Sequence, residues 1–399
     1  MKIIEFKKYE NVPEGKKLNR KKVGCALGAL AVVLILIIIF SIYVCNRNFR
    51  EFMDKYILRK SVNENSLPSI EIENSDNMHI FAYDKYVVVL EKNKLKQYNS
   101  SGSEVSNLEV NVSNPVTATS NRYILIAEKD KQKAYLVTNS KVVWEKDIEG
   151  TISRVSVNDN GYSSIIVSGT TYKSVIITYD NTGKEIFKTY LSTSIATDAT
   201  ISNDNKYMSF AEVDTTGTLI QYKIKTVDVE SAKQLPDKAI IQEYQMDLDQ
   251  LLVNIEYQDR NKLVAMCNDG VWNLANGNKE KIIEYHTNLS KITFSGIELD
   301  DYAFRIEEII YGPLNQASNI EITNTSSKKT NLYTLNGVAK EVYSKDDIIA
   351  VNIGAEVYFI RTNGWLVKKY ISSQEVKSIV VSGNIAGIIY RDKIEFLGL

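Results

Sequence analysis

The sequence predicts an all-β protein, an eight-bladed β-propeller, preceded by one transmembrane helix and a short amphipathic helix. Three observations support this prediction. Residues 23–45 form an apolar run of 23 residues without a charge. From residue 69 onward the chain consists of short β-type runs, and one kind of polar turn recurs about every 44 residues.

The apolar run VGCALGALAVVLILIIIFSIYVC (23–45) is long enough to cross a membrane as a helix. A helix rises about 1.5 Å per residue, and the hydrocarbon core is roughly 30 Å thick. Five basic residues crowd its N-terminal side: Lys16, Lys17, Arg20, Lys21 and Lys22. The positive-inside rule therefore predicts a single-pass protein of the cell membrane, with residues 1–22 as a cytoplasmic tail and the remainder extracytoplasmic. The alternative is a cleaved signal peptide, but no small-residue cleavage site follows the run.

The segment NRNFREFMDKYILRKSV (46–62) predicts an amphipathic helix next to the membrane. Its apolar residues recur at helical spacing, with charged residues between them; the apolar positions are Phe49, Phe52, Met53, Tyr56 and Ile57. Pro68 marks the end of the helical region, because the residue before a proline resists helix. This helix is expected to pack on the outer domain or lie at the membrane surface, with self-association as the alternative.

Residues 67–399 are predicted to form the propeller. Strands such as KYVVVLEK (85–92) and EVYFIRT (356–362) are rich in β-branched and aromatic residues and end in turn residues. The recurring turns lie near 102, 140, 183, 235, 277, 327 and 364. A period of 40–50 residues is typical of a four-stranded blade, which buries its faces only against its neighbours. A pair of β-sandwiches is the alternative fold.

The turns are expected between the third and fourth strands of seven blades. Residues 376–399 then supply three strands of an eighth blade, and LPSIEIEN (67–74) has the length and pattern to provide the fourth. That pairing would join the two ends of the propeller and remove exposed strand edges. Seven blades remain the alternative if the irregular segments are loops.

Two repeats carry insertions, at 212–238 and 305–319. The second contains four apolar residues around the Gly312-Pro313 turn: Ile309, Ile310, Tyr311 and Leu314. Long loops in repeat proteins often bind partners, so this segment is a possible partner-binding loop. An extended hairpin that packs on the adjacent blade is the alternative.

Charge and cysteine content narrow the possible functions. Residues 1–22 hold eight of the 48 basic and three of the 49 acidic residues, so the rest of the chain carries a net charge of about −6. This argues against nucleic acid as a partner. Cys25 and Cys45 lie at the ends of the apolar run and only Cys267 lies in the outer domain, so no disulfide is expected there. Cys267 is interpreted as a buried small hydrophobe.

No motif indicates a catalytic site, a metal site or a cofactor. The only histidines are His79 and His286, and HExxH, CxxC, GxSxG and phosphate-loop patterns are absent. The acidic pairs Asp300-Asp301 and Glu307-Glu308 are expected on the surface, with a glycosidase-like role as the alternative. Trp144 and Trp365 are assigned to fourth strands, where aromatic side chains pack between blades.

Several stretches resemble a known family: FREFMDKYILRKSV (49–62), LPSIEI (67–72), YDKYVVVLEKNKLKQYNSSG (83–102), VSGTTYKSVIITYDNTGKEIFKTYL (167–191) and ISNDNKYMSFAEV (201–213). They are similar to a family of uncharacterised single-span proteins of anaerobic Gram-positive bacteria. The resemblance runs from about residue 23 to the end. It implies bacterial origin, membrane anchoring and a propeller-like outer domain, and no activity. KVVWEKDIEG (141–150) also resembles the repeat of quinoprotein-like propellers, which implies blade geometry and not quinone binding.

Two functional hypotheses follow. The first is a non-enzymatic interaction or scaffold module for a protein or cell-envelope polymer. The second is an envelope carbohydrate-active enzyme that uses carboxylates in the propeller channel. Three or more acids with raised pKa values in the channel would favour the enzyme.

Overall fold

The structure, a computed structural model, describes residues 20–58, 60–64, 66–169, 171–258, 261–285, 291–312 and 315–399. The chain forms two compact units, Met1–Ser61 and Val62–Leu399. Most of the expected cytoplasmic tail lies outside the described residues, as does His286.

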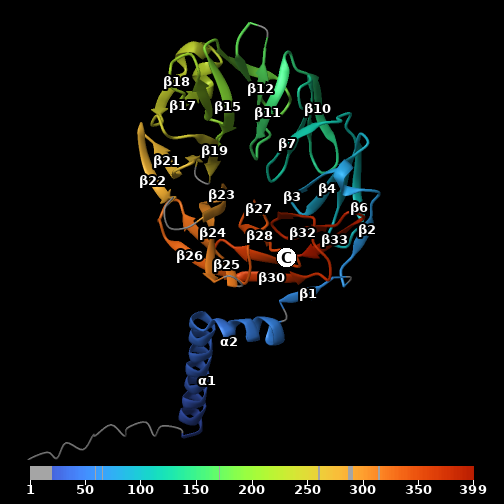
Figure 1. The fold of residues 1–399 in the computed structure, drawn as a ribbon, viewed down its shortest axis with the longest axis vertical. Coiled ribbons are helices and arrows are strands. Elements are labelled where there is room, and N and C mark those ends of the chain that lie inside the picture. The colour runs from blue at the N-terminus through green and yellow to red at the C-terminus, as the bar shows by residue number, and fades with distance from the viewer. Residues whose placement is uncertain are drawn as a thin grey trace, which may run out of the picture. The chain divides into compact units, whose positions relative to one another are not determined.

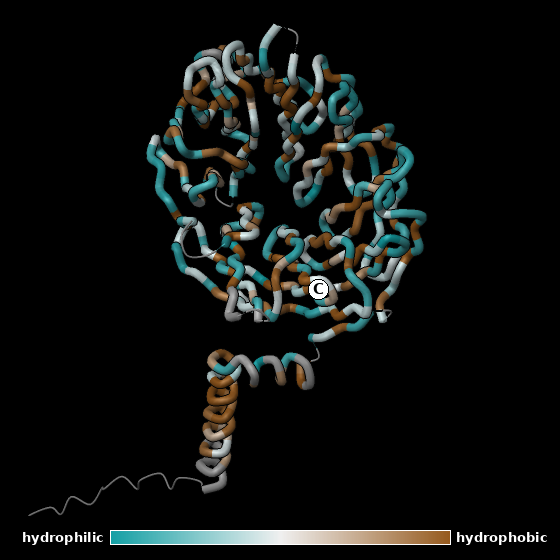
Figure 2. The backbone as a smooth tube through the Cα atoms, in the orientation of Figure 1, coloured by the Kyte–Doolittle hydropathy of each residue, from teal (hydrophilic) through white to brown (hydrophobic). Residues whose placement is uncertain are grey.

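The first unit is helical. Helix α1 (Arg20–Cys45) contains the expected span, and Figure 2 shows it as an almost continuous hydrophobic segment. Its part Leu27–Cys45 is long and apolar enough to cross a membrane, a property that signal sequences share. Helix α2 (Arg47–Phe52) follows and is capped by the Asn46 side chain, which accepts a hydrogen bond from the Phe49 amide at 3.0 Å.

The amphipathic helix is shorter than the expected 46–62. It continues as a π-helical turn, η1 (Met53–Ile57), and then stops. The Asp54 side chain accepts a hydrogen bond from the Tyr43 hydroxyl at 2.7 Å and lies 3.0 Å from the Lys60 ammonium. The helical region ends at Ile57, and Ser61–Asn63 forms strand β1 instead of a further helical turn.

The second unit is a ring of eight antiparallel sheets, which confirms the eight-bladed propeller (Figure 1). Blades 1 and 2 are β3 (His79–Tyr83), β4 (Tyr86–Glu91), β5 (Lys94–Tyr98), β6 (Glu104–Glu109) and β7 (Pro115–Thr119), β8 (Ile124–Glu128), β9 (Lys133–Val137), β10 (Val142–Asp147). Blades 3 and 4 are β11 (Thr151–Val157), β12 (Ser163–Ser168), β13 (Ser174–Tyr179), β14 (Glu185–Leu191) and β15 (Ser194–Ile201), β16 (Tyr207–Asp214), β17 (Gln221–Asp228), β18 (Ile240–Gln245).

The remaining four blades continue in chain order. Blades 5 and 6 are β19 (Leu252–Gln258), β20 (Lys262–Cys267), β21 (Gly270–Ala275), β22 (Asn278–Glu284) and β23 (Lys291–Leu299), β24 (Tyr302–Gly312), β25 (Asn315–Asn324), β26 (Thr330–Leu335). Blades 7 and 8 are β27 (Glu341–Lys345), β28 (Ile348–Asn352), β29 (Glu356–Arg361), β30 (Leu366–Ile371) and β31 (Ser378–Ser382), β32 (Ile385–Ile389), β33 (Lys393–Gly398). All seven recurring turns join the third and fourth strands of a blade, as the sequence predicts.

Strand β2 (Ser69–Glu71) is the fourth strand of blade 8. It pairs antiparallel to β33, with Ile70 opposite Ile394, and the Phe396 amide donates to the Pro68 carbonyl at 2.9 Å. An N-terminal strand therefore completes the C-terminal blade, at the place proposed for 67–74. The sequence did not indicate β1, which adds a fifth strand to blade 7 beside β30.

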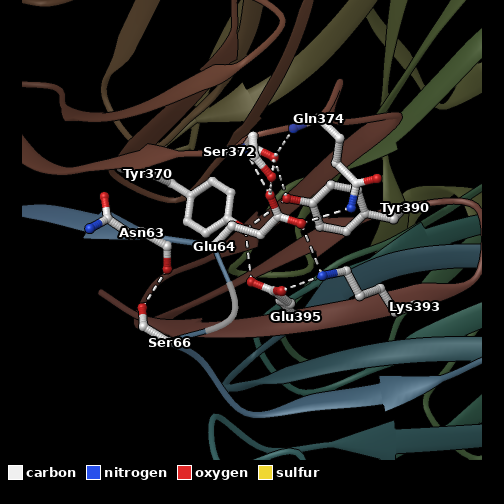
Figure 3. A network of polar contacts seen from close by, with 10 residues as sticks. Asn63, Glu64, Ser66, Tyr370, Ser372, Gln374, Tyr390, Lys393 and Glu395 are labelled. Carbon is white, nitrogen blue, oxygen red and sulfur yellow. Dashed lines mark hydrogen bonds and ion pairs between the residues drawn. The ribbon is translucent and has the colours of Figure 1, made fainter.

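Glu64 joins these two N-terminal strands to the ring (Figure 3). Its carboxylate accepts hydrogen bonds from the Ser372 hydroxyl at 3.0 Å, the Ser373 amide at 2.8 Å and the Gln374 side chain at 2.7 Å. Lys393 lies 3.2 Å away. Desolvation opposes the charge, but these donors outweigh it and hold the pKa of Glu64 at about 2.

Side chains from adjacent blades form the hydrophobic core between them. Trp144 of blade 2 is buried against Tyr179 of blade 3, with ring centroids 5.9 Å apart, as the sequence predicts. Cys267 is buried as expected, between blades 4 and 5. The prediction for Trp365 is wrong: it lies in the turn before β30 and is 44% exposed. The turn between the third and fourth strands is shared between blades, but in blade 7 the residue just before the fourth strand, Trp365, faces solvent.

The two insertions are mainly longer strands. The first lengthens β16 and β17 and places the short helices α3 (Val229–Ala232) and η3 (Pro236–Lys238) before β18. The second is the long hairpin β24–β25, whose register runs from Tyr302↔Asn324 to Gly312↔Asn315. Its base is buried through Ile306 and Ile320. Up to its tip, this segment is therefore an extended hairpin, as the alternative interpretation expects.

Candidate functional site

The innermost strands of blades 2 to 7 enclose a central cavity of about 520 Å³. Six acidic and two basic residues line it: Asp159, Asp198, Glu256, Glu298, Asp300, Asp346, Arg154 and Lys345. Walls of low dielectric strengthen the field of such charges. The cavity, here called the channel, is therefore an electronegative site.

A repeated β-bulge sets the positions of the channel residues. The register between first and second strands shifts just before Arg154 in β11, Asp198 in β15 and Asn254 in β19. In β23 it shifts at Phe294 and again between Gly296 and Leu299, next to Glu298. A bulge inserts one residue and changes the direction of the side chains that follow. Because the bulges recur in four consecutive inner strands, the side chains after them face the same channel.

Asp198 ties three blades together. Arg154 of blade 3 places its Nε 2.9 Å from the Asp198 carboxylate. The backbone amides of Ala199 and Ile255 each donate to that carboxylate at 2.9 Å. Burial raises the pKa of Asp198, while Arg154 and the two amides oppose the rise. With three donors committed to it, the Asp198 carboxyl group has a structural role in joining the blades.

Two further contacts connect the walls of the channel. The Asn254 side-chain amide donates to Glu298 at 3.3 Å, from blade 5 to blade 6. The Lys345 ammonium of blade 7 donates to both the carbonyl and the hydroxyl of Thr119 in blade 2, each at 2.9 Å. The contact between Lys345 and Thr119 therefore links blade 7 to blade 2 across the inner side of blades 8 and 1. The other six blades line the cavity.

The pKa of Glu256 is strongly perturbed by its place in the channel. Desolvation, followed by repulsion from Glu298 and Asp198, raises the pKa of Glu256 to about 8. Desolvation also raises the pKa of Glu298, against the attraction of Lys345 and Arg154. Glu256 is consequently a neutral carboxylic acid at pH 7, able to donate a hydrogen bond or release a proton.

The acidic pairs singled out in the sequence do not form a site together. Asp301 lies in a turn of blade 6, 3.1 Å from Lys262. Glu307 and Glu308 lie on β24, where Arg305 and Lys291 pair with them at 3.1 and 3.5 Å. Asp300 alone lines the channel.

The proposed partner-binding residues are only partly visible. Ile309 is partly buried on β24, opposite Ala317. Leu314 and the side chains of Ile310 and Tyr311 lie outside the described residues. Their role in binding stays a prediction.

Sequence reasoning missed the five central charged residues: Arg154, Asp198, Glu256, Glu298 and Lys345. The available signal was one charged residue in each of several inner strands that are otherwise apolar or small, as in TISRVSV and SIATDATI. Interpreting that signal requires the strand order within each repeat. Within the described residues, no group of three or more His, Cys, Asp or Glu side chains is placed to hold a metal ion. His79 is partly buried, and its Nε2 lies 3.0 Å from the Thr117 hydroxyl.

A family model matches residues 58–399, which is the whole propeller together with β1. The chain belongs to the DUF5711 family. That family is described as one of unknown function. No curated protein matches this chain.

Solved structures resemble this DUF5711 protein in fold. The C-terminal WD40 domain of Sif2 is 14% identical with a TM-score of 0.53, and the match covers 84% of this chain and 99% of that one. Hydrazine synthase of Kuenenia stuttgartiensis is 10% identical with a TM-score of 0.43, covering 83% and 97%. The likeness to the Sif2 domain shows the propeller fold alone.

Proposed function

We propose that this protein is a membrane-anchored, extracytoplasmic interaction module that binds a positively charged group of a protein or cell-envelope ligand in its channel. The observation that supports this proposal is the excess of acids over bases around the cavity. Amino and guanidinium groups are the biological cations that such a site attracts. The cavity volume of about 520 Å³ is also within the range of ligand pockets.

Glu256 makes the affinity of the channel for a cation depend on pH. A cation beside this side chain favours the carboxylate over the acid, so binding at pH 7 releases a proton. Affinity then rises with pH up to about 8, the pKa of Glu256 in the empty channel. The other charges that act on Glu256 are Glu298, Asp198, Lys345 and Arg154.

Lysinamide and agmatine test the proposal, with glutarate as the anionic control. Calorimetry on the full-length protein in nanodiscs is expected to detect the two cations and not glutarate. Their affinity should increase between pH 6 and about 8 in the wild type, and this increase should disappear in Glu256→Gln. Binding of glutarate in place of the cations would overturn the proposal.

The membrane location in this proposal rests on the apolar part of α1 and on the basic residues before it. A tag at the N-terminus should be protected from protease added to wall-stripped cells, and a C-terminal tag should be accessible. A mature protein that begins after residue 45 would instead identify α1 as a signal sequence.

An envelope carbohydrate-active enzyme is the second candidate, because three channel acids, Asp198, Glu256 and Glu298, have raised pKa values, which is the condition stated above as favouring an enzyme. Asp198 is an unsuitable base, because Arg154 and two backbone amides already donate to its carboxylate. New reducing ends from cell-wall polysaccharides, formed by the wild type and absent with Glu256→Gln, would establish the enzyme. Lack of turnover alongside cation binding favours the interaction module.

The tip of the β24–β25 hairpin belongs to the same proposal as a partner contact. Replacing residues 309–314 by a Gly/Ser linker should remove partner crosslinks in cells and leave the melting temperature unchanged. Loss of stability would instead show that these side chains serve the packing of blade 6.

A further inference from the structure

The two basic residues of the channel are held in different ways. Arg154 forms an ion pair with Asp198, whose carboxylate lies 2.9 Å from its Nε. Lys345 instead donates to two neutral oxygens, the carbonyl and the hydroxyl of Thr119, each at 2.9 Å. Among the described residues no carboxylate lies within ion-pair distance of the Lys345 ammonium. The charge of Lys345 is therefore present in the channel without a contacting counter-ion.

Asp346, the residue after Lys345, does not neutralise this charge. Its carboxylate accepts hydrogen bonds from the Gly383 amide at 2.9 Å and from the Ser382 hydroxyl at 3.2 Å, both of blade 8. An ammonium group has three donors, and Thr119 takes two of those of Lys345. The third donor has no partner in the part of the chain that the structure describes.

The cavity that contains Lys345 also contains acids that respond to its charge. Lys345, Thr119, Glu256 and Glu298 all line it. Desolvation raises the pKa of Glu298, and the attraction of Lys345 is the largest effect that opposes the rise. For Glu256, Lys345 is likewise the first of the two cations that oppose the raised pKa. Lys345 consequently acts on both acids through space and forms an ion pair with neither.

The balance of charge makes the position of this ammonium important. Three acids of the inner strands, Asp198, Glu256 and Glu298, share the channel with two bases, so one of these acids has no basic partner. If Lys345 turned from Thr119 towards the acids, it would occupy the place that an amino or guanidinium group of the ligand takes under the proposed function. Held on Thr119, it leaves that place open and still repels the ligand.

We propose that Lys345 is a built-in competitor of the ligand cation, and that the carbonyl and hydroxyl of Thr119 hold it aside so that the channel can bind. This proposal rests on the proposed function and adds the residue that limits its affinity. Thr119 acts through Lys345 and is a positioning residue. The same contact joins blade 7 to blade 2, so the experiment has to separate competition from a purely structural role.

Two substitutions at this contact should change the affinity for agmatine in opposite directions. Lys345→Met removes the competing charge and should strengthen binding by about tenfold, because a like charge near the ligand is lost. Thr119→Val removes the hydroxyl acceptor, so Lys345 turns towards the acids and binding should weaken by about threefold or more. Both substitutions break the same link between blades, so a purely structural role would change the affinity in the same direction in both.

Calorimetry on the full-length protein in nanodiscs at pH 9 measures these affinities. At this pH Glu256, whose pKa is about 8, is largely ionised in the wild type, so its proton does not offset the gain from Lys345→Met. Thr119→Ser keeps the hydroxyl and should bind agmatine within about twofold of the wild type.

Lys368→Met is the matched control. Lys368 lies on β30 of the same blade, donates to the Gly398 carbonyl of blade 8 and does not line the cavity. Its loss removes one positive charge and one hydrogen bond between blades away from the channel. The affinity for agmatine should therefore change by less than about twofold.

Equal affinity of Lys345→Met and the wild type, or changes of the same sign in Lys345→Met and Thr119→Val, would overturn the proposal. Agmatine binding by the wild type would leave the proposed function standing in either case, so the two failures are distinguishable. Absence of binding by both the wild type and Lys345→Met would overturn both proposals. Binding by Lys345→Met alone would support the competitor role, with Lys345 blocking the channel completely.

Discussion

The carboxylate of Glu64 lies 3.2 Å from the ammonium of Lys393, although 329 positions separate them in the chain. Lys393 also pairs with the buried Glu395 at 2.8 Å, and Glu395 accepts a hydrogen bond from Tyr370 at 2.7 Å. The contact therefore joins the N-terminal segment of the propeller to a polar network that spans blades 7 and 8 (Figure 3).

Glu64→Gln is expected to remove a pH-dependent part of the stability. The folded-state pKa of about 2 lies below the ordinary value of 4.5, so the charged form stabilises the fold above pH 4.5 and this stabilisation is lost as pH falls toward 2. The shift corresponds to roughly 3 kcal/mol at pH 7, with the side chain only 7% exposed. Denaturant unfolding between pH 3 and 7 measures it. The exposed Glu149 is the control, and Glu149→Gln should leave the profile unchanged.

Deleting β2 is expected to destabilise the propeller. A chain that begins at residue 78 lacks Ile70 and Ile72, which pack against the core between blades 8 and 1. Full burial of such a side chain contributes about 1.5–3 kcal/mol, so these two partly buried residues contribute less than that each, and the deletion also exposes the edge of β33. A chain that begins at residue 62 retains β2 and should fold. Equal melting temperatures for the two chains would disprove the closure.

Glu256→Gln should stabilise the protein at alkaline pH. The pKa of this acid is raised to about 8 in the folded protein, so the folded state binds more protons than the unfolded state and wild-type stability falls as pH rises from about 4.5 to 8. The amide cannot ionise and avoids this loss, on the order of 4 kcal/mol at pH 8. Unfolding curves at pH 5 and pH 8.5 should converge for the variant. A wild type without this slope would contradict the raised pKa.

Arg154 and Asp198 should behave as a coupled pair. Arg154→Met leaves the Asp198 carboxylate buried without its cation, which costs about 2–4 kcal/mol. Asp198→Asn leaves the partly exposed Arg154 in contact with water and should cost less. In the double variant part of the loss should be recovered, and a double-mutant cycle measures the coupling. Additive effects would show that the ion pair contributes nothing.

The blade number was predictable because each blade repeats the same local requirements. Four short strands need alternating or continuous apolar residues, and the turn between the third and fourth strands needs residues such as Asn-Ser-Ser-Gly near 102 or Asp-Asn-Thr-Gly near 183. These are properties of neighbouring residues, and they recur along the chain. The site was not predictable in this way. Arg154 and Asp198 are 44 positions apart and meet only after two blades pack side by side.

The sequence by itself determined the apolar helix, the all-β class, the number of blades and the lack of a recognisable catalytic motif, because all of these depend on composition and short-range periodicity. Tertiary structure alone decided the charged channel, the fifth strand β1 and the Glu64 network. It also decided that Glu256 is a neutral acid at pH 7, since the desolvation and the repulsion from Glu298 and Asp198 arise only when inner strands of different blades surround one cavity. Pairwise distance in space, and not separation in sequence, determines an electrostatic interaction.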